Sequence, residues 1–114
     1  MEVAEIMLRE KRFLYVGFMC HQVVEKIFKG CYTKLKDEVP PFTHELPYLA
    51  VRGGFYALLS EEQKDFIDRL NPLNIRARYP DYRKELAKEL TASRCRAIME
   101  DTKRVQQWIK EKLL

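Results

Sequence analysis

The sequence is poor in residues that break helices and has no long hydrophobic run. Its 114 residues include only 4 glycines and 5 prolines. No apolar segment approaches the roughly 20 residues that a membrane-spanning helix needs. The start, MEVAEIMLREK, is acidic and amphipathic, unlike a signal peptide. These absences argue against a membrane or secreted protein, and we expect the chain to be cytoplasmic.

Cysteine and histidine are also scarce. The chain has three cysteines and only two histidines, His21 and His44, with no CxxC or HxxxH spacing. The pattern therefore predicts neither a metal site nor a cofactor. Cys20 and Cys31 would lie three helical turns apart, roughly 16 Å along the axis, so they cannot bridge each other. We expect buried, reduced thiols, as is usual in the cytoplasm.

Apolar residues at helical spacing dominate what remains. Hydrophobic residues make up 46% and charged residues 33% of the chain, a composition typical of one soluble, helix-rich domain over residues 1–114. The longest pattern runs from Phe13 to Leu35 and predicts a central helix ending near Lys36. Gly17 lies on its apolar face, where the missing side chain would let another helix approach closely. That face also contains Cys20, Val24, Ile27, Cys31 and Leu35.

Shorter helices are predicted on both sides of the central one. Residues 2–10 form a short amphipathic helix, with a bend at Lys11 and Arg12 before the central helix. Ser60 and Gln63 have the spacing of a capping box, and Pro72 should interrupt the helix that this box begins. A further short helix is expected to open within residues 43–47 and to stop at Gly53 and Gly54. Others are expected at 81–90 and from Thr91 to about Lys112. The fold class is therefore all-α: an antiparallel up-down bundle of four to five helices with a short crossover helix.

Basic residues gather near the end of the chain. Residues 76–96 hold seven Lys and Arg against three acids, which accounts for the net charge of +4. Within this region Arg78 and Arg83 offer two guanidinium groups for phosphate, and Tyr79 offers a ring for stacking. The structural alternative is equally concrete, because Pro80 would make a rigid corner in which Arg78 pairs with an acid and Tyr79 packs.

The central helix carries a polar cluster of its own. His21 and Glu25 are spaced to pair one turn apart, and with Lys26 they could form the inner wall of a site. Lys26 could reach a phosphate, whereas Lys29 is expected on a solvated face. His44 lies at a helix start, where capping or turn chemistry would explain it. His21 and His44 thus have structural interpretations as well as ligand-binding ones.

Three segments resemble a known family. CHQVVEKIFKG, PPFTHELPYLA and ARYPDYR occur in this order and spacing and are similar to segments of HEPN-domain proteins, the higher eukaryotes and prokaryotes nucleotide-binding family. The resemblance covers roughly residues 2–112. It implies a helical bundle that usually forms a homodimer. It also implies partnership with a minimal nucleotidyltransferase, often as a toxin–antitoxin pair, while other members of the family are ribonucleases.

The chain departs from the ribonuclease members at one motif. Those members carry an Arg followed four to six residues later by a His, but neither histidine here has an arginine at that spacing, and the residue after a four-residue gap from Arg78 is Arg83. An arginine cannot exchange a proton near neutral pH. The sequence therefore resembles the non-nuclease branch, which binds a nucleotide or RNA without cutting it, and no catalytic residue is assigned.

The candidate binding residues are His21, Lys26, His44, Arg78, Tyr79 and Arg83. Two alternatives stay open. The first is a metal-independent endoribonuclease toxin that combines Arg78 with His21 or His44 in a composite site at the dimer interface. The second is a purely structural dimeric adaptor.

Overall fold

The computed structural model describes residues 2–74 and 90–114, and within them every regular element is a helix. In chain order the elements are α1 (Glu2–Arg9), α2 (Phe13–Lys36), α3 (Leu46–Gly53), the 3₁₀ turn η1 (Tyr56–Leu58), α4 (Glu61–Leu70), the 3₁₀ turn η2 (Asn71–Asn74) and α6 (Ala92–Lys112). The predicted all-α bundle is confirmed. The helix expected at 81–90 lies almost entirely outside the described residues.

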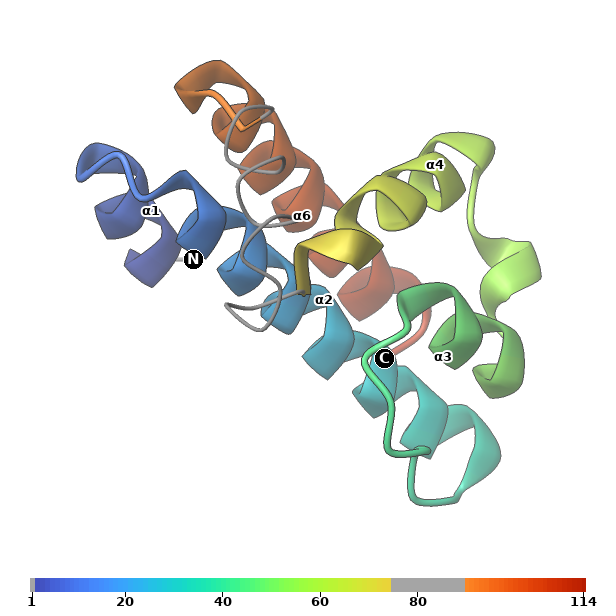
Figure 1. Cartoon of the computed structure of the whole chain (residues 1–114). Coiled ribbons are helices and arrows are strands. Elements are labelled where there is room, and N and C mark those ends of the chain that lie inside the picture. Colours follow the sequence, from blue (N-terminus) through green and yellow to red (C-terminus); the bar gives the residue numbers. More distant parts are fainter. Residues whose placement is uncertain (1, 75–89) are drawn as a thin grey trace.

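Helix α2 is the central element of the bundle, as its apolar pattern predicted. It packs against α1, α3, α4 and α6 (Figure 1). Its fully buried side chains include Val16, Cys20, Val24 and Phe28, and the Phe28 ring meets Phe55 edge to face at 5.1 Å. Burial of this face supplies most of the stabilisation, because helices of this length gain little from propensity alone.

The long helices have a definite relative direction. The Cys95 thiol at the start of α6 lies 3.7 Å from the Phe13 carbonyl at the start of α2, and Thr102 lies beside Cys20 one to two turns further along both helices. Helices α2 and α6 therefore run parallel. Helix α4 runs the opposite way, so the chain goes up and down as predicted (Figure 1).

Gly17 allows the close approach that the sequence predicted. A Cβ at this position would lie 2.9 Å from Leu73 Cδ1, so the turn η2 could not pack here against a larger residue without moving. Pro72 lies within η2. The expected interruption of α4 is thus a tightening from α-helix to 3₁₀ rather than a sharp kink.

Helix ends follow local chemistry. Ser60 and Gln63 form the complete capping box at the start of α4, and the Thr91 side chain accepts a hydrogen bond from Arg94 N at the start of α6. Helix α1 ends with Lys11 in the left-handed region at φ 61°. The amide of Lys11 donates to Leu8 O and that of Arg12 to Met7 O, which is the Schellman pattern. The predicted bend before α2 is therefore present.

Candidate functional site

A buried carboxylate on α2 is the centre of a polar cluster. The Glu25 side chain, 8% exposed, accepts a hydrogen bond of 3.0 Å from Lys29 Nζ and one of 2.9 Å from His44 Nδ1. His21 Nδ1 lies 3.5 Å from the same carboxylate. His21, Glu25 and Lys29 face one another because they are one turn apart on α2, whereas His44 comes from the loop before α3. We call these four residues the Glu25 cluster.

The surroundings of the cluster shift the pKa values of Glu25 and His21. Burial disfavours the charged form of Glu25, but the hydrogen bonds from Lys29 and His44 outweigh it, so the pKa of Glu25 is lowered from its ordinary 4.5. Burial lowers the pKa of His21 below its ordinary 6.5, and the Glu25 carboxylate opposes this only in part. His21 is fully buried, and neither ring nitrogen has a hydrogen-bond partner of good geometry in the described part of the chain. At neutral pH Glu25 is therefore ionised and His21 neutral.

His44 is positioned by contacts on two sides. Its Nδ1 faces the Glu25 carboxylate, which can only accept, so Nδ1 carries a proton and donates it to Glu25. The two residues that follow His44 are held by Asn71, which donates to the Glu45 carboxylate and accepts from the Leu46 amide. The His44 side chain is 52% exposed. The helix-start position predicted for His44 is correct, but the side chain binds Glu25 of α2 rather than capping α3.

A groove of about 510 Å³ lies beside the cluster, between the start of α1 and the middle of α2. Its lining combines apolar side chains with polar and charged ones. Lys26 is exposed at this groove and has no carboxylate within 4 Å among residues 2–74 and 90–114. The lining residues are Glu2, Val3, Ala4, Met19, Gln22, Val23, Glu25, Lys26 and Lys29.

The structure separates the candidate residues of α2. Lys26 lines the groove, but His21 is buried away from it, so the two do not form one wall as expected. Glu25 joins them, since it lines the groove and also contacts His21. Lys29 was expected on a solvated face, yet it is part-buried and paired with Glu25. Arg78, Tyr79 and Arg83 lie outside the described residues.

Sequence reasoning also missed Gln22. It lines the groove beside Lys26 and Lys29. A signal for it was present, because positions 22, 26 and 29 follow one another at helical spacing and must share a face of α2.

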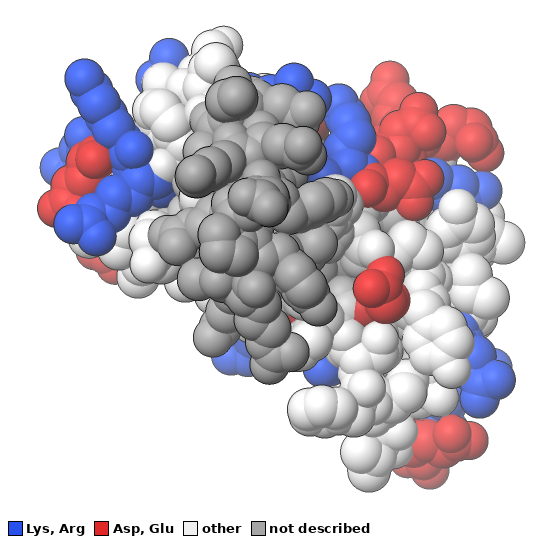
Figure 2. All heavy atoms as spheres, in the orientation of Figure 1, with Lys and Arg blue, Asp and Glu red and all other residues white. Residues whose placement is uncertain are grey.

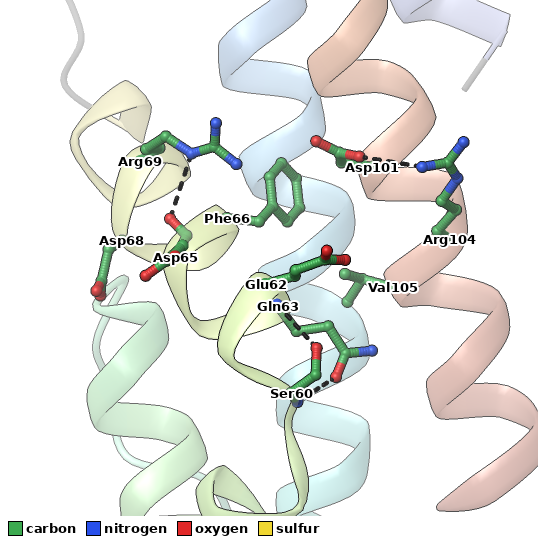
Figure 3. A pocket seen from close by; sticks show the side chains of 10 residues that line it. All are labelled: Ser60, Glu62, Gln63, Asp65, Phe66, Asp68, Arg69, Asp101, Arg104 and Val105. Carbon is green, nitrogen blue, oxygen red and sulfur yellow. Dashed lines mark hydrogen bonds and ion pairs between the residues drawn. The ribbon is translucent and has the colours of Figure 1, made fainter.

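A larger groove of about 770 Å³ lies between α4 and α6 (Figure 3). Four acids line it, against two arginines, of which Arg104 is 3.7 Å from Asp101. Figure 2 shows acidic atoms gathered over α4. Such a surface repels phosphate, so this groove suits an anionic ligand less well than the groove at Lys26. It is lined by Ser60, Glu62, Gln63, Asp65, Phe66, Asp68, Arg69, Asp101, Arg104 and Val105.

Residues 2–74 and 90–114 contain no group of three or more His, Cys, Asp or Glu side chains arranged to hold a metal ion. None of the helices in these ranges combines the length and apolar character needed to cross a bilayer.

Comparison with known proteins gives one match. The HEPN domain family matches residues 1–113, nearly the whole chain. Curated proteins and solved structures give no significant match. The match agrees with the helical bundle and with the resemblance of the three segments to this family. The chain therefore belongs to the HEPN domain family.

Proposed function

We propose that this chain is a binding module that holds a nucleotide or RNA in the α1–α2 groove without cutting it. Membership of the HEPN family indicates a nucleotide- or RNA-related role. The groove supports the more specific proposal, because its volume is in the range of small-ligand sites and its lining is mostly apolar with a few polar groups. Val3, Met19 and Val23 offer a surface for a base, and the Gln22 amide can both donate to and accept from a base edge.

The observation that carries the proposal is the unpaired charge of Lys26. Lys29 and His44 both donate hydrogen bonds to Glu25, so the Glu25 carboxylate already compensates the charge of Lys29. Lys26 has no such partner in the described residues, and its ammonium group is available to a phosphate at the rim of the groove.

Titration of the purified chain with AMP, ATP and a short single-stranded RNA tests this proposal. Lys26→Glu should weaken binding by about tenfold or more, because it removes a charge-assisted hydrogen bond and adds repulsion. Lys110→Glu, an exposed charge reversal on α6, is the matched control and should bind like the wild type. A wild-type chain that binds none of these ligands would refute the proposal.

The proposal includes a protein partner and a homodimer. We infer that the chain acts in the cytoplasm beside a minimal nucleotidyltransferase, and that the two form a toxin–antitoxin pair, as the family resemblance implies. Co-expression with a nucleotidyltransferase encoded next to this chain should give a complex that co-purifies through size-exclusion chromatography. Separate elution of the two proteins at micromolar concentration would count against it.

A ribonuclease is the second candidate, and one contact favours it. The Glu25 carboxylate holds His44 through Nδ1, and a His44 that is neutral would then present Nε2 as a general base. His21 is fully buried and cannot reach RNA, so His44 is the histidine that would act with Arg78. Metal-free RNA cleavage, lost in both His44→Ala and Arg78→Ala, is the result this candidate requires. Intact RNA after long incubation would remove it.

A further inference from the structure

The loop between α2 and α3 displays two apolar side chains almost completely to solvent. Val39 is 88% exposed and Phe42 is 98% exposed. We call residues 37–45 the docking loop. Phenylalanine is usually buried, because its ring is one of the largest apolar groups in a protein. In Figure 2 a broad uncharged area covers the position that α3 and this loop occupy in Figure 1.

The exposure does not come from a loosely attached segment. At one end, Asp37 closes α2 through a hydrogen bond from its amide to Thr33 O. At the other end, His44 binds Glu25, and the Glu45 amide donates to the Thr43 hydroxyl. Asn71 then holds Glu45 from η2. These contacts fix both ends of the loop that presents Phe42, whose ring lies 6.2 Å from the His44 ring, and this restriction lowers the entropic cost of binding.

The docking loop contains three acidic side chains and no lysine or arginine. Asp37, Glu38 and Glu45 are exposed, and none has a Lys, Arg or His within 4 Å in the described ranges. The exposed Lys34 and Lys36 end α2 just before the loop, so the loop itself is a short acidic segment on a chain whose net charge is +4. The sign of this segment opposes nucleic acid, because phosphates would meet the carboxylates of Asp37, Glu38 and Glu45.

The same charges argue against a symmetric contact with a second copy. A two-fold axis through the docking loop would place the acidic loops of the two copies against each other. Such like-charge contacts cost free energy at an interface. A different protein with basic residues around an apolar pocket complements both features of the loop.

We propose that the docking loop binds a protein partner whose surface has an apolar pocket bordered by Lys and Arg residues. Phe42 fills the pocket, Val39 packs at its edge, and Asp37 and Glu38 face the basic border. In many protein interfaces a central aromatic side chain supplies most of the affinity. Charged residues at the rim then contribute specificity. His44 is a positioning residue of this surface, since its bond to Glu25 holds the loop. The inference does not depend on nucleotide binding in the α1–α2 groove.

The first experiment identifies the partner at the predicted contact. Phe42 is replaced by a photo-crosslinking benzoylphenylalanine in cells that produce the chain at its natural level. Leu58, which is 57% exposed on η1, carries the same group in a control strain. We expect one protein to be crosslinked from position 42 and not from position 58. Crosslinks only to a second copy, only to RNA, or at the level of the control would overturn the proposal.

The second experiment measures binding of that purified protein. Phe42→Ala should weaken the complex by about thirtyfold, the effect of losing an interface hot spot. Phe42→Leu should retain part of the affinity, and Glu38→Lys should weaken binding most at low salt. Tyr48→Ala, an exposed aromatic residue of α3, is the matched control. Circular dichroism melts confirm that each variant is folded. An affinity unchanged by Phe42→Ala would refute the proposal even if the partner is genuine.

Discussion

His44 Nδ1 lies 2.9 Å and 3.1 Å from the two carboxylate oxygens of Glu25, across 19 positions of the sequence. This contact ties the docking loop to the middle of α2. Glu25 also lines the groove that contains Lys26. The docking loop and the α1–α2 groove therefore share one buried carboxylate, that of Glu25.

Glu25→Gln should test the energetic weight of that carboxylate. The amide keeps the size of the side chain but loses the charge that Lys29 and His44 bind. We expect the free energy of unfolding to fall by about 1–3 kcal/mol, measured by urea denaturation at neutral pH. Glu100→Gln, at an exposed position of α6, should change it by less than about 0.5 kcal/mol. Equal stability of Glu25→Gln and the wild type would contradict a structural role of the cluster.

His21 should make the fold sensitive to mild acid. Its pKa in the folded chain is below the ordinary 6.5, so the unfolded chain takes up a proton first as the pH falls. The His21 contribution is therefore fully present above pH 6.5 and declines below it. The pKa of Glu25 in the folded chain is lowered from its ordinary 4.5. The contribution of Glu25 to the free energy of unfolding is therefore lost only below about pH 4.5. His21→Gln should flatten the dependence of unfolding free energy on pH between about 5 and 6.5, and an unchanged slope would contradict this.

Lys11→Gly should stabilise the chain. Lys11 has a φ of 61°, which costs free energy for any residue with a side chain, and glycine is the usual residue at this point of a Schellman motif. We expect a gain of about 0.5–1 kcal/mol in urea denaturation. Arg96→Gly, at an exposed position inside α6, should have the opposite sign and cost about 1 kcal/mol. Loss of stability in Lys11→Gly would show that its side chain makes a contact that outweighs the strain.

Gly17→Val should disturb the packing of η2 on α2. The added Cβ would lie 2.9 Å from Leu73 Cδ1 and 3.4 Å from Leu73 Cβ, and valine adds two further methyl groups. Overpacking of this kind costs about 1–3 kcal/mol. Gly30→Val, on the same helix with no atom within 4 Å of its added Cβ, is the control and should not destabilise. A double-mutant cycle with Leu73→Ala should show coupling between positions 17 and 73; additive effects would argue against the contact.

The three thiols should resist modification in the folded state. Burial raises the pKa of Cys31 and of Cys95 to about 11 and also raises that of Cys20. Because the thiolate is the reactive form, native protein at about pH 8 should react with Ellman's reagent only as fast as it unfolds. Addition of urea should release all three thiols. Rapid reaction of one thiol in native protein would mean that its site opens locally.

Periodicity and local signals predicted most of the described fold. The apolar face of α2, the capping box at Ser60 and the cap at Thr91 depend on residues within a few turns, so sequence spacing was sufficient for them. The bend at Lys11 was also predicted, although the pattern could not show that Lys11 itself takes the left-handed conformation. That conformation results from the packing of α1 on α2.

The candidate site was less predictable because its contacts are distant in sequence. His44 and Glu25 meet only after the docking loop has folded back onto α2. Lys29 was expected to be solvated because nothing near it in sequence shows that Glu25 is buried and shared. Phe42 attracted no functional interpretation, since an apolar residue between Pro41 and Thr43 gives no sign of whether it will be covered.

The parallel arrangement of α2 and α6 has a consequence for synthesis of the protein. Phe13 and Cys95, which meet at the start of this helix pair, are separated by 82 positions. While the ribosome is still making the middle of the chain, the face of α2 that contains Val16, Cys20 and Val24 lacks its covering helix. Contacts of such long range also slow folding, because a large loop must close before they form. The newly made chain therefore passes through a stage in which this apolar face is exposed to chaperones and to other nascent chains.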